Sequence, residues 1–315
     1  MKQLFYFILL LAGISSMHSC KEMVDDEGNP LIDLNETGGL NGPRALYREV
    51  TNADTIAEYH YNGLLLSRVL TPGLDNGNSV TDIMYSGDKI SKIDFKGFLD
   101  EDNDGAVEED SISYTQLFTY GINGRLESIS ENRVVFTRTP GTPPTIPPGP
   151  WTEARKIKKL YNLTYNATTN KMSTITMRTG DEVVGIPFEY TNYSITDYEY
   201  LGDNVSKVVR SYGPMSGGQI TPTVATKYGY EFMDYDARIS PYSLLPQVYK
   251  ISLLLSTEAK DFRSLILSPN NPKRYSVTDL MMPIPSPVVF TSNYNYDAQT
   301  YMTRGFGVYY FYKPF

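Results

Sequence analysis

Cysteine and histidine are almost absent from this chain of 315 residues. It contains one cysteine, Cys20, and two histidines, His18 and His60. With no second cysteine there is no disulfide within the chain, and no thiol nucleophile beyond Cys20 itself. If His18 is lost with the N-terminal segment described below, His60 stands alone. A catalytic zinc site of the His and Cys type is then excluded, because such sites take at least two of these ligands.

Blocks of basic residues and long apolar runs are also missing. Lys and Arg number 28 against 36 Asp and Glu, so the formal net charge is −8. A chain this acidic, without a cluster of Lys and Arg, is not suited to neutralising phosphates, which argues against nucleic-acid binding. After Cys20 no apolar run reaches the roughly 20 residues that a membrane-spanning helix needs.

The first twenty residues have the zones of an export signal. Lys2 is followed by the apolar run 4–14 and by the serine-containing segment 15–19, which ends at Cys20. This order is typical of a secretory signal peptide. The cysteine directly after it resembles the lipobox of bacterial lipoproteins, in which that cysteine is acylated and becomes the first residue. We therefore expect residues 1–19 to be removed and lipid on Cys20 to hold the chain to a membrane. An ordinary signal peptide with an unmodified cysteine is the alternative.

The residues after Cys20 indicate a tether and a location. Residues 20–45 are polar and rich in Gly and Pro, which predicts a flexible tether, and residues 46–315 form the expected domain. Lys21 and the acidic residues after it resemble the signal with which Bacteroidetes send lipoproteins to the cell surface. The resemblance implies an outer-membrane lipoprotein that faces the cell exterior, with the periplasmic face as the alternative. Two tripeptides resemble the O-glycosylation consensus of the same group and place sugar on Thr55 and Ser111.

One pattern recurs through the domain. An aromatic or aliphatic residue, one intervening residue and a Tyr lead into a short polar turn, and a second alternating run follows. The copies begin at Tyr59, Ile83, Phe118, Leu163 and Tyr198, with weaker copies at Tyr228 and Tyr294. Period-two alternation around turn residues predicts a β-hairpin at each copy. The fold class is therefore all-β: a long antiparallel meander of hairpins, forming a curled open sheet or half-barrel, or closing on itself.

Two segments interrupt the pattern. Residues 139–150 are proline-rich and predict a surface loop. Residues 242–267 lose the strand alternation and predict a short helical insertion that caps one end or the concave side of the sheet, with Pro246 limiting the start of the helix.

The repeat resembles the tyrosine-containing YD or Rhs type of β-repeat. The segments Tyr235–Tyr242, Ser268–Pro272 and Tyr294–Asp297 more closely resemble a Bacteroidetes lipoprotein family of unknown function that is described as having a porin-like fold. The likeness covers roughly residues 50–315, with Ser240 where the family pattern has Asn. It implies a fold and a location, and no activity.

An acidic segment offers a candidate calcium loop. Asp100, Asp102 and Asp104 alternate before Gly105, as in the first half of a calcium-binding loop. The twelfth position is Ser111, where such a loop carries a bidentate Glu. The segment is either a weak structural calcium site or a solvated acidic turn, and no other cofactor is expected.

Aromatic residues supply the remaining candidates. The chain has 26 tyrosines and one tryptophan. Most tyrosines occupy the repeated hairpin position, where packing explains them. Trp151 and Tyr161, beside the proline-rich loop, escape that explanation and are the predicted ligand contacts.

These observations favour a non-enzymatic binding or accessory lipoprotein for a glycan, a lipid held in the concave face, or a protein partner. A carboxylate-based hydrolase of surface carbohydrate is the alternative, and a purely structural envelope protein is a third. No catalytic residue is assigned. A hydrolase predicts two or more acidic side chains that converge in a pocket, whereas a binding module predicts an apolar groove or an aromatic patch.

Overall fold

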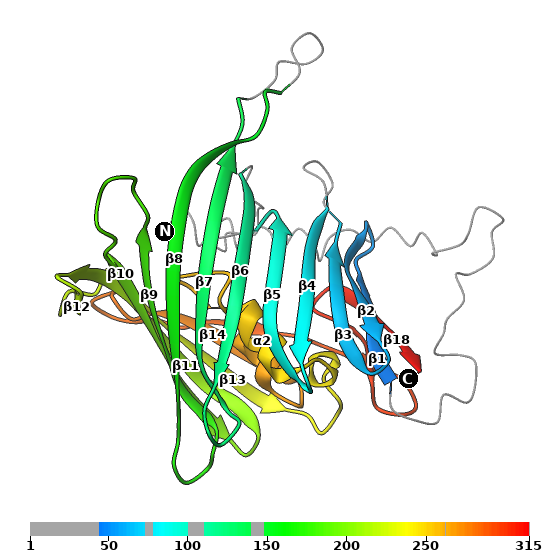
Figure 1. The fold of residues 1–315 in the computed structure, drawn as a ribbon. Coiled ribbons are helices and arrows are strands. Elements are labelled where there is room, and N and C mark those ends of the chain that lie inside the picture. The colour runs from blue at the N-terminus through cyan, green and yellow to red at the C-terminus, as the bar shows by residue number, and fades with distance from the viewer. Residues whose placement is uncertain (1–43, 73–77, 100–109, 140–147, 262, 315) are drawn as a thin grey trace.

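The chain folds into one antiparallel sheet that curls around a helical insertion (Figure 1). The computed structural model describes residues 44–72, 78–99, 110–139, 148–261 and 263–314. Within these residues the sheet has 18 strands, most of which pair with their neighbours in sequence. The predicted fold class, an all-β antiparallel meander that forms a curled open sheet, is confirmed.

The strands differ in length, and the helical elements are short. In chain order the strands are β1 (Arg44–Val50), β2 (Thr55–Asn62), β3 (Leu65–Thr71), β4 (Ser79–Ser86), β5 (Lys89–Gly97), β6 (Ser111–Tyr120), β7 (Leu126–Thr137), β8 (Thr152–Tyr165), β9 (Met172–Asp181), β10 (Asn192–Leu201), β11 (Asn204–Ser216), β12 (Gln219–Ile220), β13 (Thr226–Tyr235), β14 (Pro272–Asp279), β15 (Val288–Thr291), β16 (Asn295–Tyr296), β17 (Met302–Gly305) and β18 (Val308–Pro314). The helical elements are η1 (Pro241–Leu244), α2 (Gln247–Leu254) and η2 (Ser264–Leu267). The first strand lies inside the sheet, because β1 pairs with both β2 and β18.

The five stronger predicted hairpins are present and share a detail of register, and the weaker one at Tyr294 is the hairpin of β16 and β17. The hairpin predicted at Tyr228 is wrong, because Tyr228 lies within β13, which continues to Tyr235 and pairs with β14 across the insertion. In the hairpin of β2 and β3 the pairing shifts between His60 and Tyr61. The same shift comes immediately before the corresponding tyrosine of the next four hairpins, Tyr85, Tyr120, Tyr165 and Tyr200. An irregularity of this kind increases the local twist of a strand pair. Its repetition at one level helps the sheet to curl.

The repeated tyrosine also joins one hairpin to the one before it. The hydroxyl of Tyr61 donates to the backbone carbonyl of Leu46 on β1 at 2.9 Å. Equivalent bonds run from Tyr85 to Leu66 (3.0 Å), from Tyr120 to Ile90 (2.6 Å), from Tyr165 to Leu126 (2.7 Å) and from Tyr235 to Val205 (2.6 Å). A half-buried phenol needs a partner for its hydroxyl. The pattern therefore requires Tyr at this position, where Phe would only pack.

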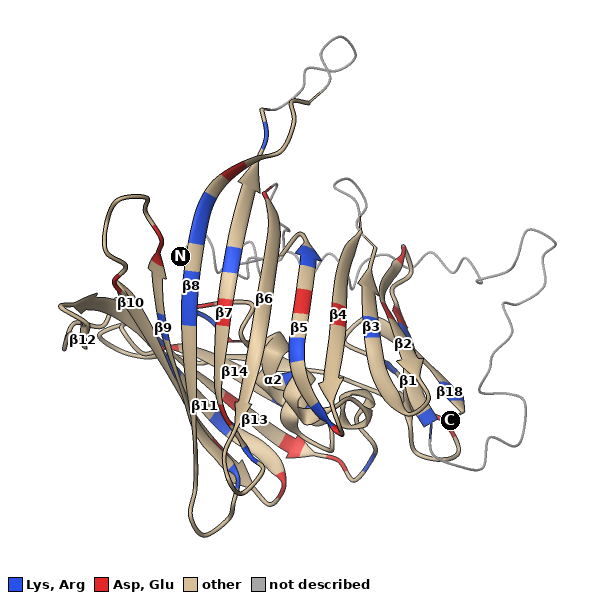
Figure 2. Cartoon of the chain, viewed as in Figure 1, with Lys and Arg blue, Asp and Glu red and all other residues tan. Residues whose placement is uncertain are grey.

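The outer face of the sheet carries cross-strand ion pairs at mid-strand. Arg48 on β1 lies 3.1 Å from Glu58 on β2, and Arg68 on β3 lies 2.6 Å from Asp82 on the adjacent strand β4. Acidic and basic positions are interspersed across the strands in view (Figure 2). The side chains of Arg68 and Asp82 are 53% and 38% exposed. Charges at mid-strand of this kind are costly against lipid.

The insertion between β13 and β14 packs on the concave side (Figure 1). Its helix α2 begins after Pro246, which fits a residue whose ring is tolerated only at a helix start. Ile251 and Leu254 of α2 are buried in the same cluster as Ile93 and Ile129 of the sheet. Burial of such a side chain is worth about 1.5–3 kcal/mol. The prediction of a short helix against the concave side is confirmed, and its span is 247–254.

The two edges of the sheet approach each other through aromatic contacts. The ring of Tyr275 on β14 lies 6.4 Å from that of Phe306, in the turn between β17 and β18. Tyr296 on β16 donates to Asp236, beside the insertion, and accepts a hydrogen bond from Asn271 at 3.4 Å. The hairpin of β16 and β17 therefore closes one side of the concave space. The two edge strands are β15, which pairs with β14, and β16, which pairs with β17.

Candidate functional site

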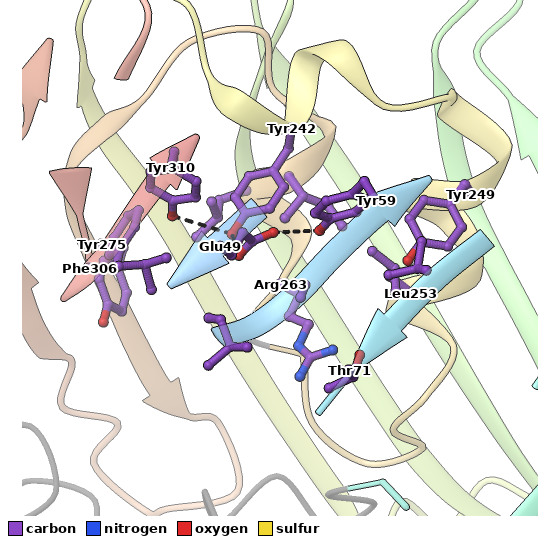
Figure 3. Close-up of a pocket in the computed structure, with 16 residues that line it drawn as sticks. Glu49, Tyr59, Thr71, Tyr242, Tyr249, Leu253, Arg263, Tyr275, Phe306 and Tyr310 are labelled. Carbon is purple, nitrogen blue, oxygen red and sulfur yellow. Dashed lines mark hydrogen bonds between the residues drawn. The ribbon is translucent and has the colours of Figure 1, made fainter. Parts of the chain in front are cut away.

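A cavity of about 500 Å³ lies between the insertion and the strands nearest the two ends of the sequence (Figure 3). Its size falls within the roughly 300–1,000 Å³ typical of small-molecule sites. The apolar and aromatic lining residues are Ile56, Ala57, Tyr59, Val69, Tyr242, Tyr249, Leu253, Leu265, Ile266, Tyr275, Phe306, Val308 and Tyr310. Thr71, Glu49 and Arg263 complete the wall. The site is thus mostly apolar, with one acidic and one basic side chain.

Glu49 is the acidic group of the cavity, and tyrosines hold it. Tyr59 donates to one carboxylate oxygen at 2.5 Å, and Tyr242 donates to the other at 3.2 Å. The Tyr242 hydroxyl also lies 3.4 Å from that of Tyr310. Burial raises the pKa of Glu49, and the two tyrosine hydrogen bonds and the charge of Arg263 only partly offset this. A buried carboxyl of this kind favours its neutral form.

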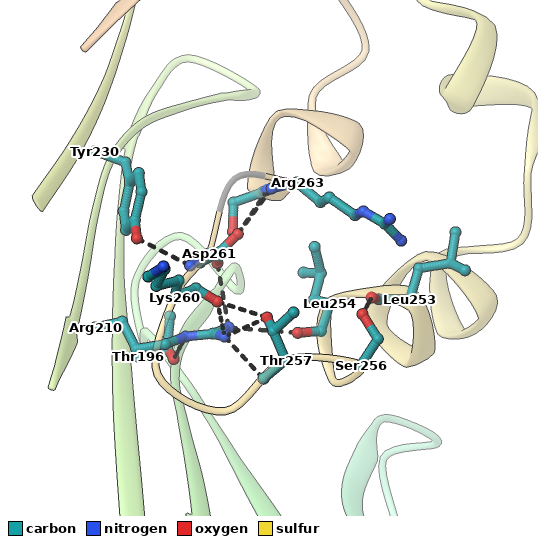
Figure 4. Close-up of polar contacts among 11 residues, drawn as sticks. Thr196, Arg210, Tyr230, Leu253, Leu254, Ser256, Thr257, Lys260, Asp261 and Arg263 are labelled. Carbon is teal, nitrogen blue, oxygen red and sulfur yellow. Dashed lines mark hydrogen bonds and ion pairs between the residues drawn. The ribbon is translucent and has the colours of Figure 1, made fainter. Parts of the chain in front are cut away.

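Arg263 is the basic group of the cavity, and it comes from the insertion. Its side chain points into the space between β3 and the Glu49 cluster (Figure 3). Its backbone is fixed by Asp261, which accepts hydrogen bonds from the amides of Arg263 and Ser264, both at 3.0 Å. The backbone at Arg263 is therefore held in place while the guanidinium extends away from these contacts (Figure 4).

A buried arginine on β11 anchors this part of the insertion (Figure 4). Arg210 donates to the backbone carbonyls of Thr257 at 3.1 Å and of Lys260 at 2.7 Å. Its guanidinium also lies 3.3 Å from the carboxylate of Asp261, and these two side chains are 3% and 1% exposed. The hydroxyl of Tyr230 accepts a hydrogen bond from the Asp261 amide at 3.0 Å. Backbone groups that would be costly to bury unpaired are thereby satisfied.

A second polar cluster joins α2 and the following loop to the middle of the sheet. Glu131 accepts from Gln116 and from Arg133, both at 2.8 Å, and all three side chains are buried. Ser252 of α2 donates to Gln116 at 2.6 Å. Lys159 on β8 lies 2.7 Å from Glu258. These groups pair with one another, so we assign them to holding the insertion and not to a ligand.

The cavity supplies one carboxylate, and this limits the chemistry it can perform. Glycoside hydrolysis uses a pair of carboxyl groups about 5–9.5 Å apart. Among the residues that line the cavity, Glu49 is the one acidic residue. A mostly apolar space with a few fixed polar groups is instead the arrangement of a binding site.

The two predicted ligand contacts lie away from this cavity. Trp151 is 37% exposed, and the guanidinium of Arg138 stacks on its ring at 4.5 Å. Tyr161 is 1% exposed and donates to the carbonyl of Leu255 at 3.5 Å, beneath the insertion. A ligand could reach Tyr161 only by displacing the insertion. Ligand contact at Trp151 and Tyr161 stays a prediction.

The other predicted sites fall at the sheet rim or outside the described residues. Thr55 begins β2 and Ser111 begins β6, and both are half-buried. Cys20 and the calcium candidates Asp100, Asp102 and Asp104 lie outside the described residues. Glycosylation, lipidation and calcium binding therefore stay predictions.

The described part of the chain holds neither a cluster of metal ligands nor a membrane-crossing helix. No group of three or more His, Cys, Asp or Glu side chains there is placed to hold a metal ion. Likewise, none of the helices in those residues has the length and apolar character needed to cross a membrane.

Sequence reasoning missed both charged residues of the cavity. Glu49 lies on a short strand before the first copy of the repeat, and nothing in its neighbourhood marks it as buried. Arg263 lies in the insertion, where no alternation predicts a face. The available signal was indirect: the first copy of the repeat begins with Tyr59, and its hydroxyl must find an acceptor when buried.

No protein-family model matches the chain, and no curated protein matches it. Among solved structures, the fold is similar to the crystal structure of a porin-like protein from Bacteroides vulgatus ATCC 8482. The two chains are 10% identical, with a TM-score of 0.44, over 85% of this chain and 93% of the other. A likeness at this level carries no argument about function.

Proposed function

We propose that the protein is a lipid-anchored binding protein of the outer membrane that holds a small, largely apolar ligand in its concave face. The observation that carries this proposal is the cavity of about 500 Å³ with its aromatic and aliphatic walls. Apolar space of this size in a folded interior is ordinarily filled by side chains, because cavities reduce stability. A space that is kept open and lined by a few fixed polar groups suits a ligand.

The anchor and the location are supported by the N-terminal residues and by the outer face of the sheet. Cys20 follows an export signal directly, and the polar residues 21–43 connect it to β1. Exposed ion pairs such as Arg68 with Asp82 favour water around the outer face. Lipid on Cys20 would then hold the domain to the membrane, with the cell exterior as the proposed side.

Binding is favoured over the two alternatives by the content of the cavity. A carboxylate-based hydrolase needs a second acidic group beside Glu49, and the cavity wall supplies none. A purely structural envelope protein has no use for open apolar space. We therefore propose no catalytic residue, no cofactor and no nucleic-acid partner.

Blocking the cavity tests the proposal. Ala57 lies in the cavity wall on β2, whereas Ala53 is exposed in the preceding turn. With the neutral fluorescent probe N-phenylnaphthylamine, we expect saturable binding to the full chain carrying Cys20→Ser. Ala57→Trp should weaken binding at least about tenfold, and the matched control Ala53→Trp should leave it unchanged. Failure of the unblocked protein to bind the probe, or equal binding by Ala57→Trp, would overturn the proposal.

Fractionation tests the anchor separately. In a bacterial host that processes lipoproteins, the full chain should appear in the membrane fraction and incorporate labelled fatty acid. Cys20→Ser should abolish both. Labelling of the Ser variant, or its full retention in the membrane fraction, would contradict lipidation at Cys20.

A further inference from the structure

The two charges of the cavity are in different situations. Both carboxylate oxygens of Glu49 already accept hydrogen bonds, from Tyr59 and Tyr242. The guanidinium of Arg263 has no ion pair or hydrogen bond to another side chain among the described residues, although it lines the cavity. The group of the site that is left to bind a ligand is therefore the cation.

Arg263 is also positioned for this task. Asp261 holds the Arg263 amide at 3.0 Å, and Arg210 in turn holds Asp261 at 3.3 Å in the buried interior. The anchoring contacts use the backbone of Arg263 and leave its side chain free to extend toward Leu253 (Figure 4). A backbone fixed in this way limits the positions that the guanidinium can reach, which lowers the entropic cost of binding an anion.

The rest of the wall requires an apolar body. Val69, Leu253, Ile266 and Phe306 face the same space. A ligand that is polar all round would lose its hydration against these side chains without replacement hydrogen bonds, at a cost of about 1–3 kcal/mol for each group. The cavity therefore fits a molecule with one polar end.

We propose that the ligand is a single-headed anionic amphiphile, whose carboxylate or phosphate binds the guanidinium of Arg263 while its apolar chain lies against Val69, Leu253 and Phe306. Arginine matches the planar geometry of both acidic groups with two parallel hydrogen bonds. This inference rests on the proposed function, because it names the ligand class of the same cavity.

Four probes with one chain length separate the head groups. Decanoate, decyl phosphate, decanol and decylamine are titrated calorimetrically, below their micellar concentrations, into the full chain carrying Cys20→Ser. That substitution keeps a lipid of the protein's own out of the cavity. We expect decanoate or decyl phosphate to bind at least about tenfold more tightly than decanol, since hydrogen bonds to charged groups contribute about 1.5–3 kcal/mol. The preferred anion of the two identifies the head group.

Variants at Arg263 test its role directly. Arg263→Gln should reduce the affinity for the preferred anion about tenfold and leave decanol binding unchanged, and Arg263→Lys should retain most of the anion affinity. Arg304 is an exposed arginine on β17 that does not line the cavity, so Arg304→Gln is the matched control. We expect this control to bind all four probes as the unsubstituted chain does.

The outcomes separate the two proposals. If none of the four probes binds, the binding function of the cavity fails and the ligand class fails with it. If decanol or decylamine binds as tightly as both anions, the anionic class is wrong while the cavity remains a binding site. Unchanged anion affinity in Arg263→Gln would overturn the assignment of Arg263. The comparison of the four probes requires no substitution in the cavity.

Discussion

Arg210 of β11 and Asp261 of the insertion form an ion pair at 3.3 Å in which both side chains are almost completely buried. The pair joins the sheet to the segment that carries Arg263. Because Arg210 also binds the carbonyls of Thr257 and Lys260, it satisfies backbone groups of a loop that has no regular structure of its own. The insertion is thus held by specific polar contacts in addition to the apolar packing of α2.

Removing Arg210 should destabilise the whole domain. In Arg210→Met the carboxylate of Asp261 loses its counter-charge, and the carbonyls of Leu254, Thr257 and Lys260 each lose a hydrogen bond. Breaking a buried pair costs about 3–5 kcal/mol. Chemical denaturation should show this decrease in the free energy of unfolding. The variant Arg210→Met with Asp261→Asn should recover part of the loss, because no buried charge is left unpaired. A loss below about 1 kcal/mol in the single variant would contradict the anchoring role.

Adjacent lysines on β8 should differ sharply in their contribution to stability. Lys159 pairs with Glu258 at 2.7 Å, and the Lys159 side chain is 1% exposed. Lys158 pairs with Glu182 at 2.9 Å on the outer face, where the Lys158 side chain is 39% exposed. Glu258→Gln leaves Lys159 buried without a counter-charge and should cost about 3 kcal/mol at neutral pH. Glu182→Gln, the matched control, should cost less than about 1 kcal/mol. Equal effects of the two substitutions would contradict the assignment.

The same comparison has a pH dependence. Burial acts to raise the pKa of Glu258, but its pairing with Lys159 and the nearby charges of Arg133 and Arg155 outweigh burial, so the net direction is downward. The stability from this carboxylate is therefore complete above the ordinary pKa of 4.5 and is lost as the pH falls through the folded value. The stability difference between the unsubstituted chain and Glu258→Gln should shrink on acidification below about pH 4.5.

Lys250 of α2 should be destabilising at neutral pH. Burial lowers the pKa of Lys250 to about 8, and the residue is 5% exposed. The unfolded chain binds this proton more tightly than the folded chain, so stability increases as the pH rises from about 8 toward the unfolded value. Lys250→Met should raise the melting temperature at pH 7. The corresponding gain in the free energy of unfolding is roughly 3 kcal/mol at most. A lower melting temperature in Lys250→Met would show that the ammonium is stabilised in the interior.

The tyrosine that recurs in each hairpin should act through its hydroxyl. Tyr120→Phe retains the ring and removes the 2.6 Å bond to the Ile90 carbonyl, so it should cost about 1 kcal/mol. Tyr309 has no hydroxyl bond among the described residues, and Tyr309→Phe is the control with an expected cost near zero. Thermal unfolding measures both. Equal effects would mean that the recurring Tyr serves only in packing.

Local pattern was sufficient to predict the sheet, because neighbouring residues determine a hairpin. The alternation around Tyr59 and Tyr61, with Asn62 and Gly63 at the turn, predicted β2 and β3, and the helical insertion followed from the loss of alternation. The cavity could not be predicted in this way. Glu49 and Arg263 meet only because β1 lies within the curled sheet and the insertion folds back onto it. Periodicity shows which residues share a face, but not which distant segments that face will meet.

Glu49 should make the domain less stable as the pH rises. Burial raises its pKa above 4.5, although the hydrogen bonds from Tyr59 and Tyr242 oppose this. Between 4.5 and the folded value, the folded chain holds a proton that the unfolded chain has released, so the free energy of unfolding falls with increasing pH. Glu49→Gln keeps an oxygen for the tyrosines and cannot ionise, so it should lose this part of the pH dependence. Melting temperatures of the two proteins should therefore diverge from about pH 4.5 upward, with the Gln variant the more stable.

Glu189→Gln, at an exposed carboxyl between β9 and β10, is the control. Parallel curves for the unsubstituted chain and Glu49→Gln would mean that Glu49 ionises as freely in the cavity as in the unfolded chain.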